Sequence, residues 1–558
     1  MNTMAKSFLG TALVAGVLTL SACGGAPIET TEAAHENIAK LVKEQIKPSR
    51  QENRVRANIE LTPTNLLSLL PNIDEYPITI AANDSATVEA VEIFTSSEKS
   101  GRGTDGLYND LAERFNRQNN KISNGKFAKV AIRKMPSGLG AQFILADKHV
   151  PDAFSPSNKL WGKMIESQGV VADEINPVTA PNTAGIVVRK SKLDLVTTDG
   201  KLDLQKLLTE VTSGEFSMGY TNPYQSSTGL NFLMMVLHSF AQGDEVEFLS
   251  PDVASAFEAF QLGVPFVAQN TLQMRDAAVG SGVLDALVME HQTWVNVTGM
   301  ADYEFVPFGV RHDSPLYALP QADEAEREVL AAFNQFIEAN KNEISKFGFG
   351  NNADYTASYD IEDGSLIQQA QKLWKDKKSG GKPIAAMFVA DVSGSMDGSR
   401  LKELKQALVD SSDLIAASNA IGLISYNDSV NIDLPVRQFN LQQKSLFIGA
   451  VESLVAGGAT ATNNGVIVAA NELLNFAAAN PDHKLVIFVL SDGETNEGLE
   501  FATVKETLRY ARIPIHSIAY ELSSDHLKEM AGLVEAAYIE SSVGSASYRI
   551  GNLLNSEM

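Results

Sequence analysis

Apolar runs of strand length alternate with helical patterns over most of the chain. Residues 88–94 and 130–135 form the first two runs, and a polar turn follows each of them. Between these runs, residues 107–115 repeat apolar side chains at the spacing of one helix face. Repeated strand–turn–helix units predict an open α/β fold with mainly parallel sheets. The same alternation continues at residues 185–188, 284–289 and 324–339.

The pattern restarts after a lysine- and glycine-rich stretch at residues 375–383. The run at 383–390 is apolar on both faces, as expected for a strand buried inside a parallel sheet. Three similar runs follow with helical patterns between them, which predicts a second α/β unit with a doubly wound parallel sheet. The predicted organisation is a leader at 1–22, a tether at 23–86, a first block at 87–343, a linker at 344–382 and a second block at 383–556.

Composition excludes several classes of function. Of 558 residues, 44% are hydrophobic and 20% are charged, so the chain is neither disordered nor collagenous. Because 45 basic residues stand against 68 acidic ones, the net charge is −23, and no nucleic-acid partner is expected. One cysteine excludes disulfide and cysteine-rich zinc frameworks. Nucleophile-elbow, zinc-protease, P-loop and dinucleotide-binding motifs are missing, so we predict that the protein is not an enzyme.

The single cysteine, Cys23, follows a short apolar stretch at residues 8–20. This stretch is too short to span a bilayer but has the length of a signal-peptide core. Leu20-Ser21-Ala22-Cys23 resembles the lipobox of bacterial lipoproteins, which implies export, cleavage before Cys23 and lipidation of its thiol. Gly24, in the place of a retention-type aspartate, favours the outer membrane if the host is Gram-negative. A plain secretory leader with an incidental cysteine is the alternative.

Oxygen-bearing side chains gather after the strands of the second block. Asp391, Ser393 and Ser395 come directly after one buried run, Asp492 follows another, and Thr460 precedes a helix. Loops beyond the carboxyl ends of parallel strands share one crevice, so these side chains are expected to converge. Oxygen ligands without nitrogen or sulfur favour Mg²⁺ or Mn²⁺ over zinc or copper. Alternatively, the same residues cap helices and build turns.

These segments resemble the metal-ion-dependent adhesion site of von Willebrand factor A domains, and the likeness covers about residues 383–556. In that family the serines bind the ion directly, the aspartates often act through water, and the ion accepts a carboxylate from a partner protein. Thr462 lies close enough in sequence to be the alternative threonine. The resemblance assigns the DxSxS element to Asp391, Ser393 and Ser395, the threonine loop to Thr460 and the last aspartate to Asp492.

The first block resembles extracellular solute-binding proteins, nearest in style to the receptors for molybdate and sulfate. The resemblance rests on hydroxyl-rich turns ahead of helices, at 95–97, 136–138 and 220–229. It implies two lobes that close over a ligand, with crossover strands at 185–188 and 284–289. Hydroxyls and backbone N–H groups at helix N-termini can hold an oxyanion. The predicted ligand residues are Ser96, Ser97, Ser137, Gly138, Ser226, Ser227 and Thr228.

Two alternatives stay open for this cleft. Lys99, Arg102 and Arg133 lie near the first-lobe turns and would instead select a carboxylate or a phosphate. Glu290, with His291 and Gln292 after it, follows a predicted strand and is a further cleft candidate.

The resulting prediction is a two-lobed binding-protein-like fold followed by a doubly wound, Rossmann-like A domain. The favoured function is a cell-envelope lipoprotein that binds a protein partner through a Mg²⁺ or Mn²⁺ site. That partner is an envelope or extracellular protein presenting an acidic residue, while the lobes capture a small oxyanion or carboxylate. The alternative is a solute receptor of a transport or sensing system, with the A domain as reporter.

Overall fold

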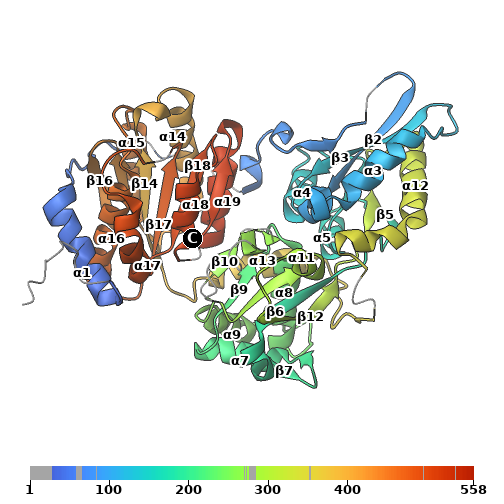
Figure 1. Ribbon diagram of the computed structural model, residues 1–558, viewed down its shortest axis with the longest axis horizontal. Coiled ribbons are helices and arrows are strands. Elements are labelled where there is room, and N and C mark those ends of the chain that lie inside the picture. Colours follow the sequence, from blue (N-terminus) through green and yellow to red (C-terminus); the bar gives the residue numbers. More distant parts are fainter. Residues whose placement is uncertain are drawn as a thin grey trace, which may run out of the picture.

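The computed structural model describes residues 28–57, 59, 66–82, 85–264, 266–268, 270–271, 273–275, 284–350, 354–493, 495–534 and 536–558. The predicted leader and the predicted lipidation site, Cys23, lie outside these residues. Three α/β bodies are visible, each built on its own sheet: two lobes and a C-terminal domain (Figure 1). The predicted α/β class is confirmed by these mixed and parallel sheets.

The first lobe has a six-stranded sheet whose centre is parallel. Its strands, in spatial order, are β1 (Ile78–Ile80), β3 (Phe127–Lys134), β2 (Val88–Thr95), β4 (Ala153–Ser155), β13 (Leu316–Ala318) and β5 (Asp173–Asn176). β2 pairs in parallel with β3 and β4, and β13 runs antiparallel to β4 and β5. Its helices are α2 (Ser97–Ser100), α3 (Leu107–Gln118), α4 (Ser137–Leu145), α5 (Leu160–Ser167) and α12 (Glu324–Ala339).

The second lobe has a five-stranded sheet. In spatial order its strands are β10 (Phe266–Ala268), β9 (Met218–Thr221), β11 (Ala286–Glu290), β6 (Thr183–Arg189) and β12 (Tyr303–Arg311). A two-stranded ribbon, β7 (Thr197–Thr198) with β8 (Lys201–Leu202), lies outside this sheet. Its helices are α6 (Leu193–Val196), α7 (Leu204–Ser213), α8 (Ser227–Phe240), α9 (Pro251–Gln261) and α11 (His291–Asn296).

The runs at 185–188 and 284–289 are strands, but the crossover role predicted for them is wrong. They belong to β6 and β11, which pair with each other inside the second lobe. The chain passes between the lobes after β5 and again after β12. These two passages are hydrogen-bonded to each other. The Thr179 amide donates to the Asp313 carbonyl at 3.1 Å, and the His312 amide donates to the Asn182 carbonyl at 3.0 Å. The error arose because a buried hydrophobic strand has the same sequence pattern in either position.

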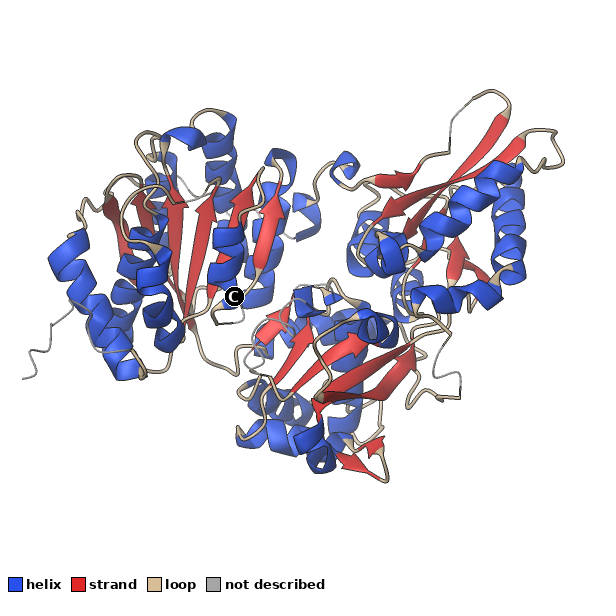
Figure 2. Cartoon of the chain, viewed as in Figure 1, coloured by secondary structure: helices blue, strands red, loops and turns tan. Residues whose placement is uncertain are grey.

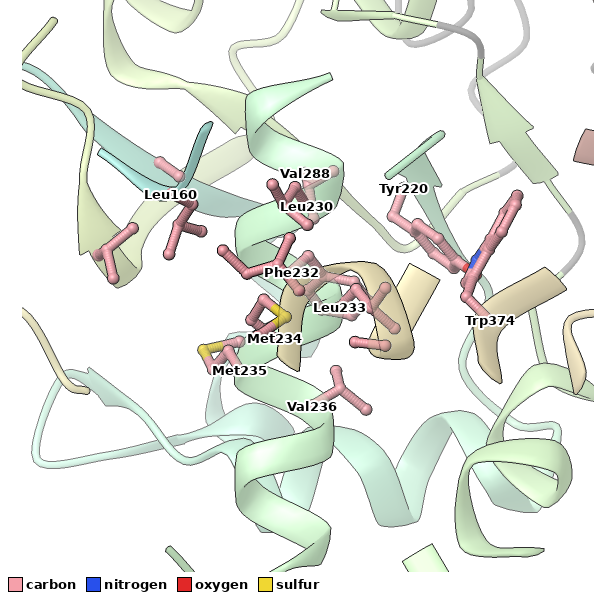
Figure 3. Packing of buried hydrophobic residues seen from close by; sticks show 14 of the residues in the cluster. Leu160, Tyr220, Leu230, Phe232, Leu233, Met234, Met235, Val236, Val288 and Trp374 are labelled. Carbon is pink, nitrogen blue, oxygen red and sulfur yellow. The ribbon is translucent and has the colours of Figure 1, made fainter. Parts of the chain in front are cut away.

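The segment predicted as a linker, 344–382, contains a helix that belongs to the lobes. α13 (Ser365–Lys377) buries one face against the second lobe, where Trp374 has no exposed surface. Its indole donates a hydrogen bond to the Tyr220 hydroxyl at 2.6 Å, beside the apolar residues of α8 (Figure 3). Burying an aromatic side chain of this size contributes about 3 kcal/mol or more, so α13 is part of the lobe's core.

The C-terminal domain is a doubly wound sheet with helices on both faces (Figure 2). Its strand order is β16 (Val430–Gln438), β15 (Ala420–Tyr426), β14 (Ile384–Asp391), β17 (Lys484–Ser491), β18 (Ile515–Tyr520) and β19 (Tyr538–Ser541). All neighbours pair in parallel except β15 and β16. The helices are α14 (Ser399–Ser411), α15 (Leu441–Glu452), α16 (Thr462–Ala479), α17 (Phe501–Ala511), α18 (Asp525–Gly532) and α19 (Ala546–Glu557).

Much of the segment predicted as a tether packs on the C-terminal domain. α1 (Thr31–Leu41) buries Ala34, Ile38 and Leu41 in the same apolar cluster as α16 and α17, beside which it lies (Figure 1). Downstream, Ser49 pairs with β16, because its amide donates to the carbonyl of Val430 at 2.9 Å and its carbonyl accepts from Ile432. The chain then reaches the first lobe, where it forms β1. The C-terminal domain, which follows the lobes in the sequence, is therefore covered in part by a segment that precedes them.

None of the helices in the described part of the chain is both long and apolar enough to cross a bilayer.

Candidate functional site

The C-terminal sheet reverses its winding beside β14. β15 lies on one side of β14, whereas β17, β18 and β19 lie on the other. In open α/β sheets such a reversal leaves a crevice at the carboxyl ends of the two central strands. Asp391 is the last residue of β14, and Asp492 directly follows β17. The sequence-predicted residues of two separate loops therefore meet at this crevice.

Asp391 is fully buried and both of its carboxylate oxygens are held. One oxygen accepts from the Ser393 amide at 2.8 Å, and the other from the Ser491 hydroxyl at 2.5 Å. Burial raises the pKa of Asp391, while the hydrogen bonds from Ser393 and Ser491 oppose that effect. A charged carboxylate in so dry a position is stabilised by a cation nearby.

Hydroxyl groups connect Asp391's loop to the second carboxylate. The hydroxyl oxygens of Ser393 and Ser395 lie 3.0 Å apart, and the Ser395 hydroxyl donates to Asp492 Oδ1 at 2.8 Å. The other oxygen of Asp492 accepts from Arg400 in the first turn of α14 at 2.7 Å. Arg400 was not among the predicted site residues.

The threonine loop lies against the first loop through its backbone. The Gly394 amide donates to the carbonyl of Gly458 at 2.9 Å, and the Gly457 amide to that of Val392 at 2.8 Å. Gly458 has φ +88°, and a Cβ there would lie 2.3 Å from an oxygen of Asp428, so only glycine allows this approach. These contacts hold the loop that carries Thr460 against the turn that carries Ser393 and Ser395.

Thr460 and its sequence alternative, Thr462, have different surroundings. The Thr462 hydroxyl is fully buried and donates to the Tyr426 hydroxyl at 3.2 Å, inside the domain. The Thr460 backbone is fixed by Asn496, which accepts its amide hydrogen at 2.8 Å. Thr460 therefore remains the better candidate, because the Thr462 hydroxyl already has an internal partner.

The donor set fits a hard divalent cation. Two carboxylates and three hydroxyls are the available side-chain ligands, and they are all oxygen. Among the described residues, no group of three or more His, Cys, Asp or Glu is placed to hold a metal.

A second candidate site lies between the lobes. It is a polar cavity of about 30 Å³, enough for one or two water molecules. Five of the predicted ligand residues line it: Ser96, Ser97, Ser137, Ser226 and Ser227. Two do not: Gly138 and Thr228. The lining residues that the ligand prediction omitted are Glu98, Pro136, Ser157, Gln225, Asn270, Thr271 and Glu290.

Gly138 instead holds the lobes in contact. Its amide donates to the carbonyl of Gln225 at 3.1 Å, and an added Cβ would lie 2.1 Å from the carbonyl oxygen of Tyr224. Thr228 lies behind the cavity, where its hydroxyl joins those of Thr221 and Ser226 at 2.9 and 2.8 Å. The lobes therefore contact each other closely beside the cavity.

Two carboxylates, one from each lobe, face this cavity. Glu98 accepts hydrogen bonds from the hydroxyls of Ser96 and Ser157, while Glu290 accepts from Asn182 at 3.0 Å and pairs with His312 at 2.8 Å. Burial raises the pKa of Glu98, and the charge of Glu290 adds to the effect. Among the described residues that line the cavity there is no lysine or arginine.

The basic residues considered for an anion are engaged elsewhere or lie outside the lining. Lys99 donates to the Ser155 carbonyl at 2.9 Å, and burial lowers the pKa of its ammonium to about 8. Arg133 pairs with Glu92 and donates to the Tyr76 carbonyl at 2.6 Å. Arg102 is exposed. Of the further cleft candidates, Glu290 lines the cavity, but His291 and Gln292 do not.

Comparisons with known proteins agree with this architecture. The family model of bacterial extracellular solute-binding proteins matches residues 100–350, and that of von Willebrand factor type A domains matches residues 387–545. The chain carries a solute-binding region followed by a von Willebrand factor A domain. The predicted resemblance to these two families is therefore confirmed, and we call the C-terminal unit the A domain.

The similar proteins share only parts of this chain. An uncharacterized protein of Synechocystis is 28% identical over 30% of this chain, and the human voltage-dependent calcium channel subunit alpha-2/delta-2 is 27% identical over 20%. These matches span 37% and 10% of the two relatives. A solved periplasmic thiamin binding protein is 12% identical with a TM-score of 0.39, over 54% of this chain and 99% of its own.

Proposed function

We propose that the protein binds a protein partner through a Mg²⁺ or Mn²⁺ ion held by the A domain. One observation carries this proposal: Asp391, Ser393, Ser395 and Asp492 form a connected set of oxygen donors at the reversal of the sheet. Thr460, on the adjoining loop, completes the proposed ligand set. These residues would hold the ion, and the ion would supply an electrophilic point for a carboxylate.

The partner chemistry follows from the charge of the site. Two carboxylates and neutral hydroxyls leave a divalent ion incompletely coordinated, so it binds a further anionic oxygen well. Arg400 reduces the negative charge at Asp492, which also favours an incoming carboxylate. A protein that presents an acidic side chain is therefore the proposed partner.

Calorimetric titration with Mn²⁺ tests the ion site. Wild type should bind one ion, and Asp391→Ala should lose that binding because it removes the most buried donor. Asp397→Ala is the matched control. Asp397 is exposed in the same loop, and its carboxylate accepts a hydrogen bond from the Gly398 amide. Equal Mn²⁺ uptake by wild type and Asp391→Ala would contradict the site. If partner capture from envelope extract is unchanged by EDTA, the site is structural and the adhesion proposal fails.

For the lobes, we propose capture of a small polar solute. Hydroxyl donors and the N-termini of α4 and α8 at the cavity support the oxyanion or carboxylate predicted from sequence. Glu98 and Glu290 favour a protonated amine instead. A thermal-shift screen with sulfate, molybdate, phosphate, simple carboxylates and simple amines distinguishes an anionic from a cationic ligand. A compound that binds the folded state raises the Tm. No shift with any of them would leave the lobes as a scaffold.

Lipidation of Cys23 is the proposed basis for location in the cell envelope. The sequence before Cys23 supports it, and solute-binding relatives are extracellular by description. Cys23→Ser should release the protein from the membrane fraction or leave its precursor uncleaved. Unchanged fractionation together with an unchanged mature mass would contradict lipidation.

One observation favours the alternative of a solute receptor with the A domain as reporter. Helix α19 of the A domain contacts both lobes beside the cavity.

A further inference from the structure

Tyr548 of the A domain bridges the two lobes. Its hydroxyl donates to Gln142 Oε1 at 2.9 Å and accepts from Gln225 Nε2 at 2.8 Å. Gln142 belongs to α4 of the first lobe, and Gln225 precedes α8 of the second. Tyr548 and both glutamines are at least nine-tenths buried. Burial raises the pKa of Tyr548 well above its usual value, so the hydroxyl keeps the proton that it donates.

The bridge lies where the lobes touch each other. The Gln142 side chain also donates to the carbonyl of Tyr224 at 3.2 Å, across the lobe boundary. One turn after Tyr548, Asn552 accepts from the same Gln225 amide at 3.4 Å. A cavity of about 180 Å³ lies at this junction, with walls from both lobes and the A domain. Gln225 lines this cavity and also the cavity between the lobes, so the bridge adjoins the cleft.

We propose that α19 is a latch on the solute cleft, so that docking of the A domain and closure of the two lobes are one linked equilibrium. Opening the lobes moves Gln142 and Gln225 apart, and Tyr548 can then keep only one of its two partners. The buried glutamine amide that loses Tyr548 makes the open state less favourable. Conversely, undocking α19 favours open lobes, because it removes the Tyr548 hydroxyl that links the side-chain amides of Gln142 and Gln225.

The linkage is reciprocal and gives the lobes a means of acting on the A domain. A ligand that binds only closed lobes strengthens the docking of α19, and a partner that binds the docked A domain favours closed lobes by the same factor. This consequence rests on the proposed solute binding, whereas the latch itself does not. The latch can therefore be tested without any ligand.

The test measures the distance between the lobes in the full-length chain. In a Cys23→Ser background, Gln118→Cys on α3 and Thr209→Cys on α7 place spin labels at exposed positions of the first and second lobes. Pulsed electron paramagnetic resonance then gives the distribution of label distances. Tyr548→Phe should broaden the distribution toward longer distances and raise the open fraction about fivefold to tenfold.

The matched control is Tyr520→Phe, because Tyr520 is a fully buried tyrosine of the same domain whose hydroxyl has no hydrogen-bond partner among the described residues. It should leave the distances unchanged. Gln142→Leu provides a second break of the bridge from the first lobe, in case Tyr548→Phe does not fold. Unchanged distances in both bridge variants, or an equal change in Tyr520→Phe, would overturn the latch. Failure of metal or solute binding alters neither arm, so the two proposals fail separately.

Discussion

The guanidinium of Arg400 donates to Asp492 Oδ2 at 2.7 Å, and the Asp492 side chain has no exposed surface. The same guanidinium pairs with Glu521 at 2.7 Å and donates to the Ser395 carbonyl at 3.2 Å. One carboxylate of the proposed ion site is therefore already paired with a cation of the chain itself. An ion at this site has to share Asp492 with Arg400.

Arg400→Gln should consequently raise the affinity for Mn²⁺. Removing a positive charge beside a ligand carboxylate strengthens cation binding, and a gain of about fivefold to tenfold is expected for a partly exposed charge. Calorimetry with Mn²⁺ measures this, with Arg437→Gln as a control that removes an exposed arginine of β16. A lower affinity in Arg400→Gln would mean that Arg400 acts mainly by holding the Ser395 turn in place.

Thr460→Ala and Thr462→Ala should separate ion binding from stability. Loss of the Thr460 hydroxyl should weaken Mn²⁺ binding about tenfold if it is a ligand. Loss of the Thr462 hydroxyl removes its hydrogen bond to Tyr426 and should cost about 1 kcal/mol of folding free energy, with Mn²⁺ affinity unchanged. Calorimetry and urea unfolding of both variants measure the two effects. The reverse pattern would assign the threonine ligand to position 462.

The convergence of Ser393, Ser395 and Asp492 was predictable because parallel strands end at one edge of a sheet. Asp391 directly follows an apolar run and Asp492 follows another after Ser491, so the sequence indicated that the two would lie at the same edge of the sheet. Arg400 was not predicted as a partner of Asp492, because an arginine in the first turn of a helix ordinarily faces solvent. Whether its side chain turns back to the crevice depends on the helix's rotation against the sheet.

Less of the region outside the two blocks could be predicted. The segments at 23–86 and 344–382 are polar enough to be interpreted as connections, yet the described parts of both contain apolar side chains that are buried in the fold. In α1 these side chains are Ala34, Ile38 and Leu41, which are spaced along one helix face, but that spacing does not indicate the surface against which they pack. In α13 the decisive contact is Trp374 on Tyr220, across 154 residues of chain. Such pairings depend on the tertiary arrangement and leave no local signal.

Gly138→Ala should force the lobes apart. In an open helix position alanine is favoured over glycine by up to about 1 kcal/mol, so without a clash the change would stabilise the protein. Here the new Cβ would lie 2.1 Å from the Tyr224 carbonyl oxygen and 2.8 Å from the Gln225 Cα, and backbone cannot yield cheaply. We expect a lower Tm and a larger radius of gyration by small-angle scattering.

Gly532→Ala is the control for this change, because a Cβ there meets nothing within 4 Å. It should leave both the Tm and the scattering unchanged or raise the Tm slightly. If Gly138→Ala behaves in the same way, the lobes do not meet at this glycine in solution.

A buried lysine lies at the junction between α13 and α19. Lys378 follows α13, and its ammonium donates to the Asn555 carbonyl of α19 at 3.1 Å. Burial lowers its pKa from 10.5 to about 7, although the charge of Glu557 acts in the opposite direction. Lys375 and Lys484 lower it further.

Lys378→Met should therefore stabilise the protein, and most strongly at or below pH 7. Because the pKa of Lys378 is lower in the folded state, the unfolded state holds the extra proton between pH 7 and 10.5. Wild-type stability then gains up to about 1.4 kcal/mol per pH unit from this group as the pH rises through that window, and the advantage of methionine shrinks accordingly. Urea unfolding at pH 6.5 and pH 9.5 measures the difference, with Lys372→Met as a control because Lys372 is an exposed lysine within α13. An equal effect of Lys378→Met at both pH values would show that Lys378 reaches solvent and that its proton is not lost on folding.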